Sequence, residues 1–148
     1  MSTTHTDHCI DVCNKLYRGE ISAIETYTQA IDKFKGEAEH STLADIRREH
    51  IFSADRLRHS IRDMGGEPTT DSGAWGMWAK AVEGAAKLMG DTPALKALLE
   101  GEEHGRNEYE EALGDDEVLS NCKEMIRNEL LPRQVRHISI LKGLMRAR

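Results

Sequence analysis

The chain has 148 residues, of which 39% are hydrophobic and 31% are charged, and its formal net charge is −6. This length and composition predict one folded domain with its own core and argue against intrinsic disorder. Acidic and basic residues are mixed with no basic stripe, so we expect no nucleic-acid partner. The apolar runs are far shorter than the roughly 20 residues of a membrane-spanning helix, so we expect no membrane span.

The N-terminal segment lacks the basic and apolar regions of a secretory signal peptide. The three cysteines are odd in number and irregular in spacing, which is typical of a reducing compartment. We therefore predict a cytoplasmic protein.

Apolar residues recur every three to four positions almost throughout and nowhere alternate with period two, which predicts an all-α fold without strands. Glycines interrupt the pattern at Gly36, at Gly65-Gly66 and at Gly114. Pro132 lies inside the last helical stretch and is expected to kink that helix without ending it. We predict one four-helix-bundle domain over residues 1–148, with long helices over about 6–35, 42–64, 93–113 and 117–145.

The connections indicate how these helices pack. The first two are joined tightly and must be antiparallel, and so must the last two. The connection over residues 65–92 is long enough to cross the whole bundle and carries a short fifth helix over about 74–89. Two hairpins joined by one long crossover form the ferritin-like arrangement. Trp75 and Trp78 on the short helix would cover the bundle or form a homodimer contact.

Each long helix has an apolar stripe that a polar residue interrupts near its middle. Burying one unpaired carboxylate costs several kcal/mol, so convergence of these residues on one polar centre explains them together. Metal binding is the most economical reason for carboxylates and imidazoles to meet inside a bundle. A buried polar network that sets the helix register is the alternative. The interrupting residues are Glu20, His50, Glu102, and Gln134 with His137.

The positions of these residues along the helices can be compared. Glu20 and His50 are equally distant from the turn between their helices, so the hairpin brings them level. Glu102 and His137 are centred about five residues beyond the break at Gly114, an offset of several Å at about 1.5 Å per residue. A longer connection would remove this offset; otherwise the residues nearest the level of Glu102 are Glu129 and Gln134.

Three segments resemble bacterioferritin and the ferritin-like superfamily. Residues 19–27 resemble the first-helix segment, in which a metal-ligand Glu precedes an Ala-Ile and a Tyr, and Glu20 falls on that ligand. Residues 102–113 resemble the third-helix segment, with Glu102 on its ligand. The sequence from Gln134 to Ile138 resembles the fourth-helix Glu-x-x-His-Ile motif, with Gln134 in place of the Glu.

The crossover resembles that of a bacterial ferritin-like family of unknown function. That family has a Gly-Gly-x-Pro turn, a Ser-Gly loop, a short Trp-containing helix and a Gly-Glu third helix. The corresponding residues here are Gly65-Gly66-Glu67-Pro68, Ser72-Gly73, Trp75 to Trp78 and Gly101-Glu102.

The resemblance implies a protein that binds iron or another divalent metal and handles iron or peroxide under stress. If it is an enzyme, it would be a metal-dependent oxidoreductase of ferroxidase or peroxidase type. A di-iron centre has four carboxylates and two histidines, whereas His50 and Ser53 here replace the second-helix Glu and His. The implied ligands are Glu20, His50, Glu102 and His137, with Gln134 and Glu129 optional or in an outer position.

The alternative function is a non-enzymatic bundle that has lost its metal site and serves as a structural or protein-interaction module. Tyr27 or Tyr109 would donate a hydrogen bond near the centre. His5, Cys9 and Cys13 lie four residues apart on one stripe, which suits either Zn²⁺ or Cu⁺ binding or plain packing at the edge of the core.

Overall fold

The computed structural model describes residues 3–70 and 90–148, and within these residues the chain is all-helical, without strands. The predicted fold class is therefore confirmed. The predicted short helix over 74–89, with Trp75 and Trp78, lies outside the described residues. The helices are α1 Thr3–Lys33, α2 His40–Asp63, α4 Asp91–Leu113, α5 Ser120–Met125, the π-helix η1 Ile126–Leu130, and α6 Leu131–Arg146.

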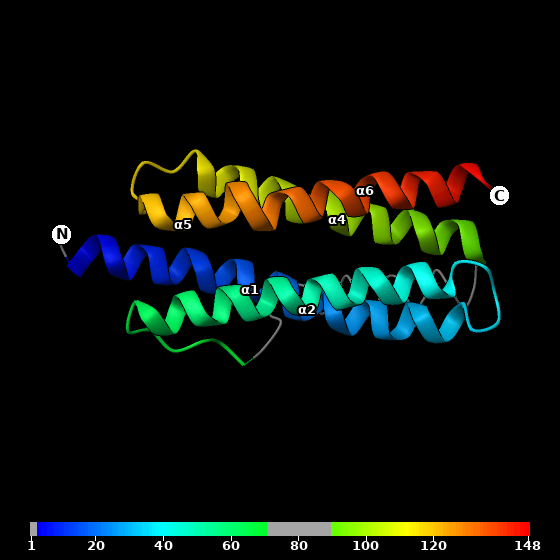
Figure 1. Ribbon diagram of the computed structural model, residues 1–148, viewed down its shortest axis with the longest axis horizontal. Coiled ribbons are helices and arrows are strands. Elements are labelled where there is room, and N and C mark those ends of the chain that lie inside the picture. Colours follow the sequence, from blue (N-terminus) through cyan, green and yellow to red (C-terminus); the bar gives the residue numbers. More distant parts are fainter. Residues whose placement is uncertain (1–2, 71–89) are drawn as a thin grey trace.

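The helices form two antiparallel hairpins that lie against each other (Figure 1). Helices α1 and α2 make the first hairpin, and α4 with the α5–η1–α6 rod makes the second. Helix α2 ends at one end of the bundle and α4 begins at the other (Figure 1). None of the helices in the described part is long and apolar enough to cross a lipid bilayer.

Helix α2 ends at the Gly65-Gly66 pair, as the sequence predicts. Gly65 has a φ of +86°, which is favourable only without a Cβ atom. Its N–H donates to the carbonyl of Arg62, and the N–H of Gly66 donates to the carbonyl of Ile61, both at 2.9 Å. These two bonds satisfy carbonyls that the helix end would otherwise leave unpaired, which is why the chain turns here.

The fourth helical rod begins at Ser120, three residues later than the expected 117. The side chain of Asp115 accepts the N–H of Glu117 at 2.9 Å, and Leu119 is extended, so residues 114–119 form a turn. As a result α5 starts beyond the end of α4 (Figure 1). The connection between α4 and α5 is therefore longer than the break at Gly114 alone suggested. This extra length removes the offset that the sequence predicted between Glu102 and His137.

The rod continues past Pro132, as predicted, and the turn before the proline is a π-helix. Proline has no N–H to donate and its ring crowds the carbonyl four residues earlier. In the π-turn the N–H of Leu131 reaches back to the carbonyl of Ile126, five residues away. The wider turn accommodates the proline without ending the rod.

The core consists of two apolar clusters with a polar layer between them. Residues at the end with the N-terminus and α5 form the N-terminal core, and residues at the other end form the opposite core. The largest fully buried members of the N-terminal core are Leu57, Ile61, Ile126 and Leu130. Those of the opposite core are Tyr27, Phe34, Leu43, Ile46, Leu95, Leu98 and Leu141.

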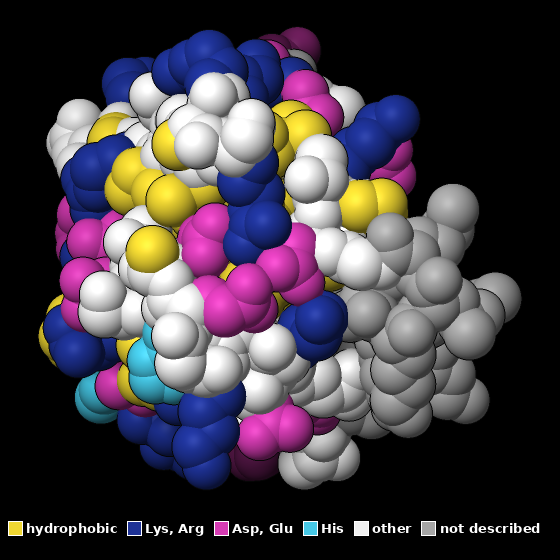
Figure 2. Space-filling model, turned by 90° about the vertical axis from the view of Figure 1, so that its right-hand side faces the viewer, with side chains coloured by type: hydrophobic (Ala, Val, Ile, Leu, Met, Phe, Trp, Pro, Cys, Tyr) yellow, Lys and Arg dark blue, Asp and Glu magenta, His cyan; other side chains and the backbone are white. Residues whose placement is uncertain are grey.

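Charged side chains close the end of the bundle near the α1–α2 turn. Acidic and basic side chains lie among one another on this face (Figure 2). Asp91 at the start of α4 pairs with Lys33 at 2.9 Å and with Arg148 at 2.9 Å, and Arg148 also reaches Glu39 at 2.8 Å. These pairs connect the α1–α2 turn with the start of α4 and the C-terminal residue.

Substitution of Gly66 by alanine should destabilise the bundle. An added Cβ would lie 2.6 Å from Cγ2 of Ile10, a branched methyl group that has little freedom to move. We expect a loss of about 1–3 kcal/mol in the free energy of unfolding, measured by urea titration. Gly114→Ala is the matched control, because its Cβ would meet atoms only at 3.6 Å or more. Equal losses for both variants would contradict the close contact with Ile10.

Candidate metal centre

The polar layer between the two cores contains one interrupting residue from each helical rod. Glu20 comes from α1, His50 from α2, Glu102 from α4 and His137 from α6. All four side chains are buried, with at most 4% of each residue exposed. The four polar interruptions of the sequence therefore converge in one layer.

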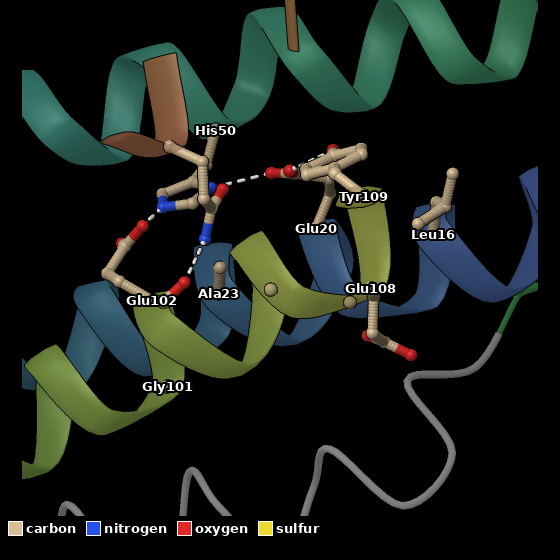
Figure 3. Close-up of a pocket in the computed structure, with 11 residues that line it drawn as sticks. Leu16, Glu20, Ala23, His50, Gly101, Glu102, Glu108 and Tyr109 are labelled. Carbon is tan, nitrogen blue, oxygen red and sulfur yellow. Dashed lines mark hydrogen bonds and ion pairs between the residues drawn. The ribbon is translucent and has the colours of Figure 1, made fainter. Parts of the chain in front are cut away.

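The imidazole of His50 lies between two carboxylates (Figure 3). Its Nδ1 is 2.6 Å from Oε2 of Glu20, and its Nε2 is 2.7 Å from Oε2 of Glu102. One ring thus links α1, α2 and α4. Distances this short are typical of charge-assisted hydrogen bonds.

Two tyrosines extend this chain, one from each core. The hydroxyl of Tyr109, in the N-terminal core, donates to Oε1 of Glu20 at 2.5 Å. The hydroxyl of Tyr27, in the opposite core, donates to Oε2 of Glu102 at 2.7 Å. Each tyrosine therefore buries its ring among apolar residues and satisfies a carboxylate with its hydroxyl group. The Tyr27 ring also stacks on His50, with ring centroids 5.4 Å apart.

His137 connects the centre to the surface. Its Nδ1 lies 3.2 Å from Oε1 of Glu102, and its Nε2 lies 2.8 Å from Oε1 of Glu49. Glu49 is partly exposed and also accepts a hydrogen bond from Arg136 at 2.5 Å. Three carboxylates, two imidazoles and one guanidinium thus form one connected network.

The network shifts the pKa values of its members. Burial alone lowers the pKa of His50, but the charges and hydrogen bonds of Glu102 and Glu20 outweigh it and raise that pKa to about 10. Burial alone raises the pKa of Glu102, but His50 and His137 bring it well below its usual range. Burial and the neighbouring carboxylates raise the pKa of both tyrosines. At neutral pH, His50 is therefore an imidazolium and the phenols remain neutral donors.

Three of these residues are arranged so that one metal ion could contact them all. One donor atom each from His50, Glu102 and His137 lies within 4.8 Å of the others. Glu20 is not a member of this group, because it faces the opposite nitrogen of His50. Among the described residues, the other such group is His8, Asp115 and Glu117, which lies near the surface.

The two remaining candidates from the sequence have other partners. The side-chain amide of Gln134 donates to the backbone carbonyl of Glu102 at 3.0 Å and so lies beside the centre. Glu129 forms a two-bond pair with Arg56 at 3.0 and 3.1 Å, with both side chains more than a third exposed. The structure therefore places Glu129 outside the buried centre.

A small cavity borders the centre on the α1–α4 side (Figure 3). It encloses about 10 Å³, which is room for about one water-sized particle. Glu20, His50 and Glu102 line it, whereas the carboxylate of Glu108 points away from them. Four small residues line the cavity and leave this space between α1 and α4 unfilled, because they have little or no side chain. They are Gly19, Ala23, Gly101 and Gly105.

Glu49 is the member of the network that sequence reasoning missed. It precedes His50 and looks like an ordinary surface acid of α2, because it lies off the apolar stripe. Its role as a partner of His137 depends on how α2 and α6 pack. The proposed hydrogen bonds from Tyr27 and Tyr109, in contrast, are both present.

A family model described as a domain of unknown function (DUF2383) matches residues 8–115 of the chain. The match includes Glu20, His50 and Glu102 and ends before His137. No curated protein and no solved structure matches the chain.

Glu102→Gln should be strongly destabilising. It removes the carboxylate that both imidazoles face and leaves His50 buried with one counter-charge fewer. Breaking a buried ion pair in this way costs about 3–5 kcal/mol, measurable by urea unfolding of metal-free protein. Glu129→Gln is the matched control, because an exposed pair contributes at most about 1 kcal/mol. A small loss for Glu102→Gln would contradict the central role of this carboxylate.

Stability should fall on both sides of a mildly acidic optimum. The folded-state pKa of His50 is about 10, above the usual value of about 6.5. Its contribution is therefore complete below about pH 6.5 and is lost as the pH rises towards 10. The pKa of Glu102 is lowered, so its contribution is present above about pH 4.3 and is lost as the pH falls below that value.

Urea unfolding of metal-free protein from pH 3 to 10 measures this profile. His50→Gln should remove the alkaline decline that is due to His50, whereas His59→Gln, on the exposed face of the same helix, should keep it. An unchanged alkaline decline in His50→Gln would show that other groups cause it.

Proposed function

The chain belongs to the DUF2383 family of domains of unknown function, and from the geometry of its centre we propose that it is a metal-binding bundle holding one divalent cation. The observation that carries the proposal is the group formed by His50, Glu102 and His137. Their donor atoms converge within 4.8 Å, and they come from three separate helical rods. No local sequence motif places them together, so the convergence is a property of the whole fold.

The donor set suits a transition metal. Two imidazoles and one carboxylate form the facial arrangement that holds iron(II) in many non-haem sites, and the same groups bind Mn²⁺ or Zn²⁺. His50, Glu102 and His137 would hold the cation, and the proton that the His50 ring shares with Glu102 would have to leave when it binds. Its positive charge would then balance the buried carboxylates as the imidazolium does without it.

Both imidazoles have a carboxylate behind them, which also supports the proposal. Glu20 faces Nδ1 of His50, and Glu49 faces Nε2 of His137. A metal-bound histidine usually donates its other ring N–H to a carboxylate, which fixes the orientation of the ring and strengthens it as a ligand. In this proposal Glu20 orients a ligand and does not itself bind the metal.

Iron is the cation that we propose, with a ferritin-like origin and a role in iron or peroxide handling under stress in the cytoplasm. The two hairpins with a long crossover support this relationship, together with the three segments that resemble bacterioferritin. One ion fits better than two. Ser53 and Gln134 stand where a di-iron site would have further ligands. The hydroxyl of Ser53 accepts a hydrogen bond from Arg133 at 3.3 Å, and the amide of Gln134 donates to the backbone carbonyl of Glu102.

The rival proposal is a bundle that has lost its metal and serves as a structural or interaction module. One observation favours it: the carboxylates and imidazoles of the centre already satisfy one another. Glu20, Glu49 and Glu102 lie within hydrogen-bond distance of His50, His137 or Arg136, so each carboxylate already has a partner among these side chains. A buried network of this kind can specify helix register without any ligand.

Metal titration separates the two proposals. Protein stripped of metal should bind one Fe²⁺ per chain under anaerobic conditions, measured by elemental analysis after desalting. Binding to the folded state alone should raise the melting temperature, because it adds about 2.7 kcal/mol at a metal concentration 100 times Kd. Only trace metal and no thermal shift with Fe²⁺, Mn²⁺ or Zn²⁺ would favour the rival.

Variants identify the ligands. His137→Ala should abolish the metal-induced shift, and His59→Ala, an exposed histidine, is the control that should retain it. Glu20→Gln should weaken metal binding by about 10–100-fold without abolishing it, as expected for a carboxylate that orients a ligand. Complete loss in Glu20→Gln would instead make Glu20 a direct ligand.

A further inference from the structure

The start of α1 carries metal-binding chemistry that the buried centre does not use. The sequence offers His5, Cys9 and Cys13 as a stripe for Zn²⁺ or Cu⁺, or as plain packing. The structure buries both thiols in the N-terminal core. His8, which precedes Cys9, lies partly exposed and faces the turn over residues 114–119. This end of the bundle therefore presents an imidazole, and not the two thiols, to solvent.

His8 meets two carboxylates of the 114–119 turn. Its Nε2 lies 2.7 Å from Oδ2 of Asp115, and its Nδ1 lies 4.0 Å from Oε2 of Glu117. One donor atom each from the three residues lies within 4.8 Å of the others, as in the buried centre. His8 and Asp115 are 107 positions apart in the chain, so only the fold brings the three residues together.

The backbone of the turn holds the Asp115 carboxylate in place. Oδ1 of Asp115 accepts the N–H of Glu117 at 2.9 Å, which leaves Oδ2 for His8. The N–H of Asp115 donates to the carbonyl of Ala112 at 3.2 Å, and its carbonyl accepts the N–H of Val118 at 3.1 Å. The group therefore has one fixed carboxylate, whereas the side chain of Glu117, 63% exposed, can still turn.

The two carboxylates are not neutralised by a lysine or an arginine. Over residues 3–70 and 90–148, no such side chain lies within the 4.0 Å of an ion pair from Asp115 or Glu117. Lys123 acts on Asp115 only from beyond that distance. Asp11 lies one turn further along α1, on the same side as His8, and adds negative charge. A divalent cation would therefore be attracted to this group.

We propose that His8, Asp115 and Glu117 form a second metal site, which binds Zn²⁺ at the surface of the bundle. One imidazole nitrogen and two carboxylate oxygens are ligands that zinc accepts, with water in the fourth position. A tetrahedral zinc ion with bonds of about 2.1 Å holds its ligand atoms about 3.4 Å apart, so His8 and Asp115 have to separate by about 0.7 Å. The three side chains are 30–63% exposed, so the ion can reach them from solvent.

The imidazole determines which cations the site takes. Ca²⁺ and Mg²⁺ prefer oxygen ligands throughout, whereas an imidazole nitrogen suits zinc. Divalent zinc also binds mixed nitrogen and oxygen ligands more tightly than Mn²⁺ or Fe²⁺ does. A zinc preference therefore distinguishes this site from a merely acidic surface.

Bound zinc would link the two hairpins. His8 lies in α1 of the first hairpin, and Asp115 and Glu117 lie in the turn between α4 and α5 of the second. The ends of terminal helices open most easily, because few contacts hold them. A metal bridge from His8 to the other hairpin would suppress this opening, so zinc should slow amide hydrogen exchange over residues 5–13.

Zinc titration of the full-length chain at equilibrium tests the proposal, because a site this exposed loses its ion during desalting. By calorimetry, His8→Gln should bind one Zn²⁺ per chain fewer than the unmodified protein does, whether or not the buried centre also takes zinc. His59→Gln, an exposed histidine of α2, is the control and should bind as many ions as the unmodified protein. Equal numbers of bound zinc ions in the two variants would overturn the proposal.

A second comparison separates a zinc site from general attraction to acidic residues. Asp115→Asn should lose the same ion, whereas Asp116→Asn, at the exposed neighbouring position, should keep it. Equimolar Ca²⁺ should leave the zinc bound, and the slower hydrogen exchange over residues 5–13 should be absent in His8→Gln. Displacement of zinc by Ca²⁺, or equal effects of the two aspartate variants, would reject the site.

Discussion

The imidazole of His50, held between the carboxylates of Glu20 and Glu102, is the interaction on which the rest of the bundle depends. Two carboxylates buried at this depth would each cost several kcal/mol if unpaired. The imidazolium offsets this cost for both at once, because its two ring nitrogens face opposite directions. These two hydrogen bonds form only when Glu20 of α1, His50 of α2 and Glu102 of α4 lie at the same height in the bundle. They therefore set the positions of three helices relative to one another.

This constraint explains the division of the core into two parts. Apolar side chains fill the bundle on both sides of the polar layer, and each side contributes one tyrosine whose hydroxyl satisfies a carboxylate. Apolar stripes alone would tolerate sliding of one helix along another by a turn, because leucine and isoleucine pack in several registers. Hydrogen bonds do not tolerate such a shift, so the layer specifies one register at the expense of some stability.

The same layer contains buried groups that could hold a metal ion. It places two imidazoles and a carboxylate around one point, supports each imidazole with a second carboxylate, and borders a cavity with room for about one water-sized particle. Structural and metal-binding roles therefore need not exclude each other, since Glu20 and Glu49 would keep their contacts with the two imidazoles if a cation were bound.

The sequence by itself determined the helices, their breaks and the polar residue in the middle of each stripe. These features follow from local chemistry: helical period, glycine at a positive φ, and the cost of burying charge. Tertiary structure alone decided which polar atoms meet. Glu49 joined the network and Glu129 did not, although both are helical glutamates off the apolar stripe. Cys122 packs in the same apolar cluster as Cys9 and Cys13, although more than a hundred residues separate them in the chain. The physical reason is that the side chain a polar residue meets on a neighbouring helix depends on how far the two helices are shifted along their axes. That offset comes from the 114–119 turn, the π-helix before Pro132 and the hydrogen bonds of His50, and no periodicity encodes it.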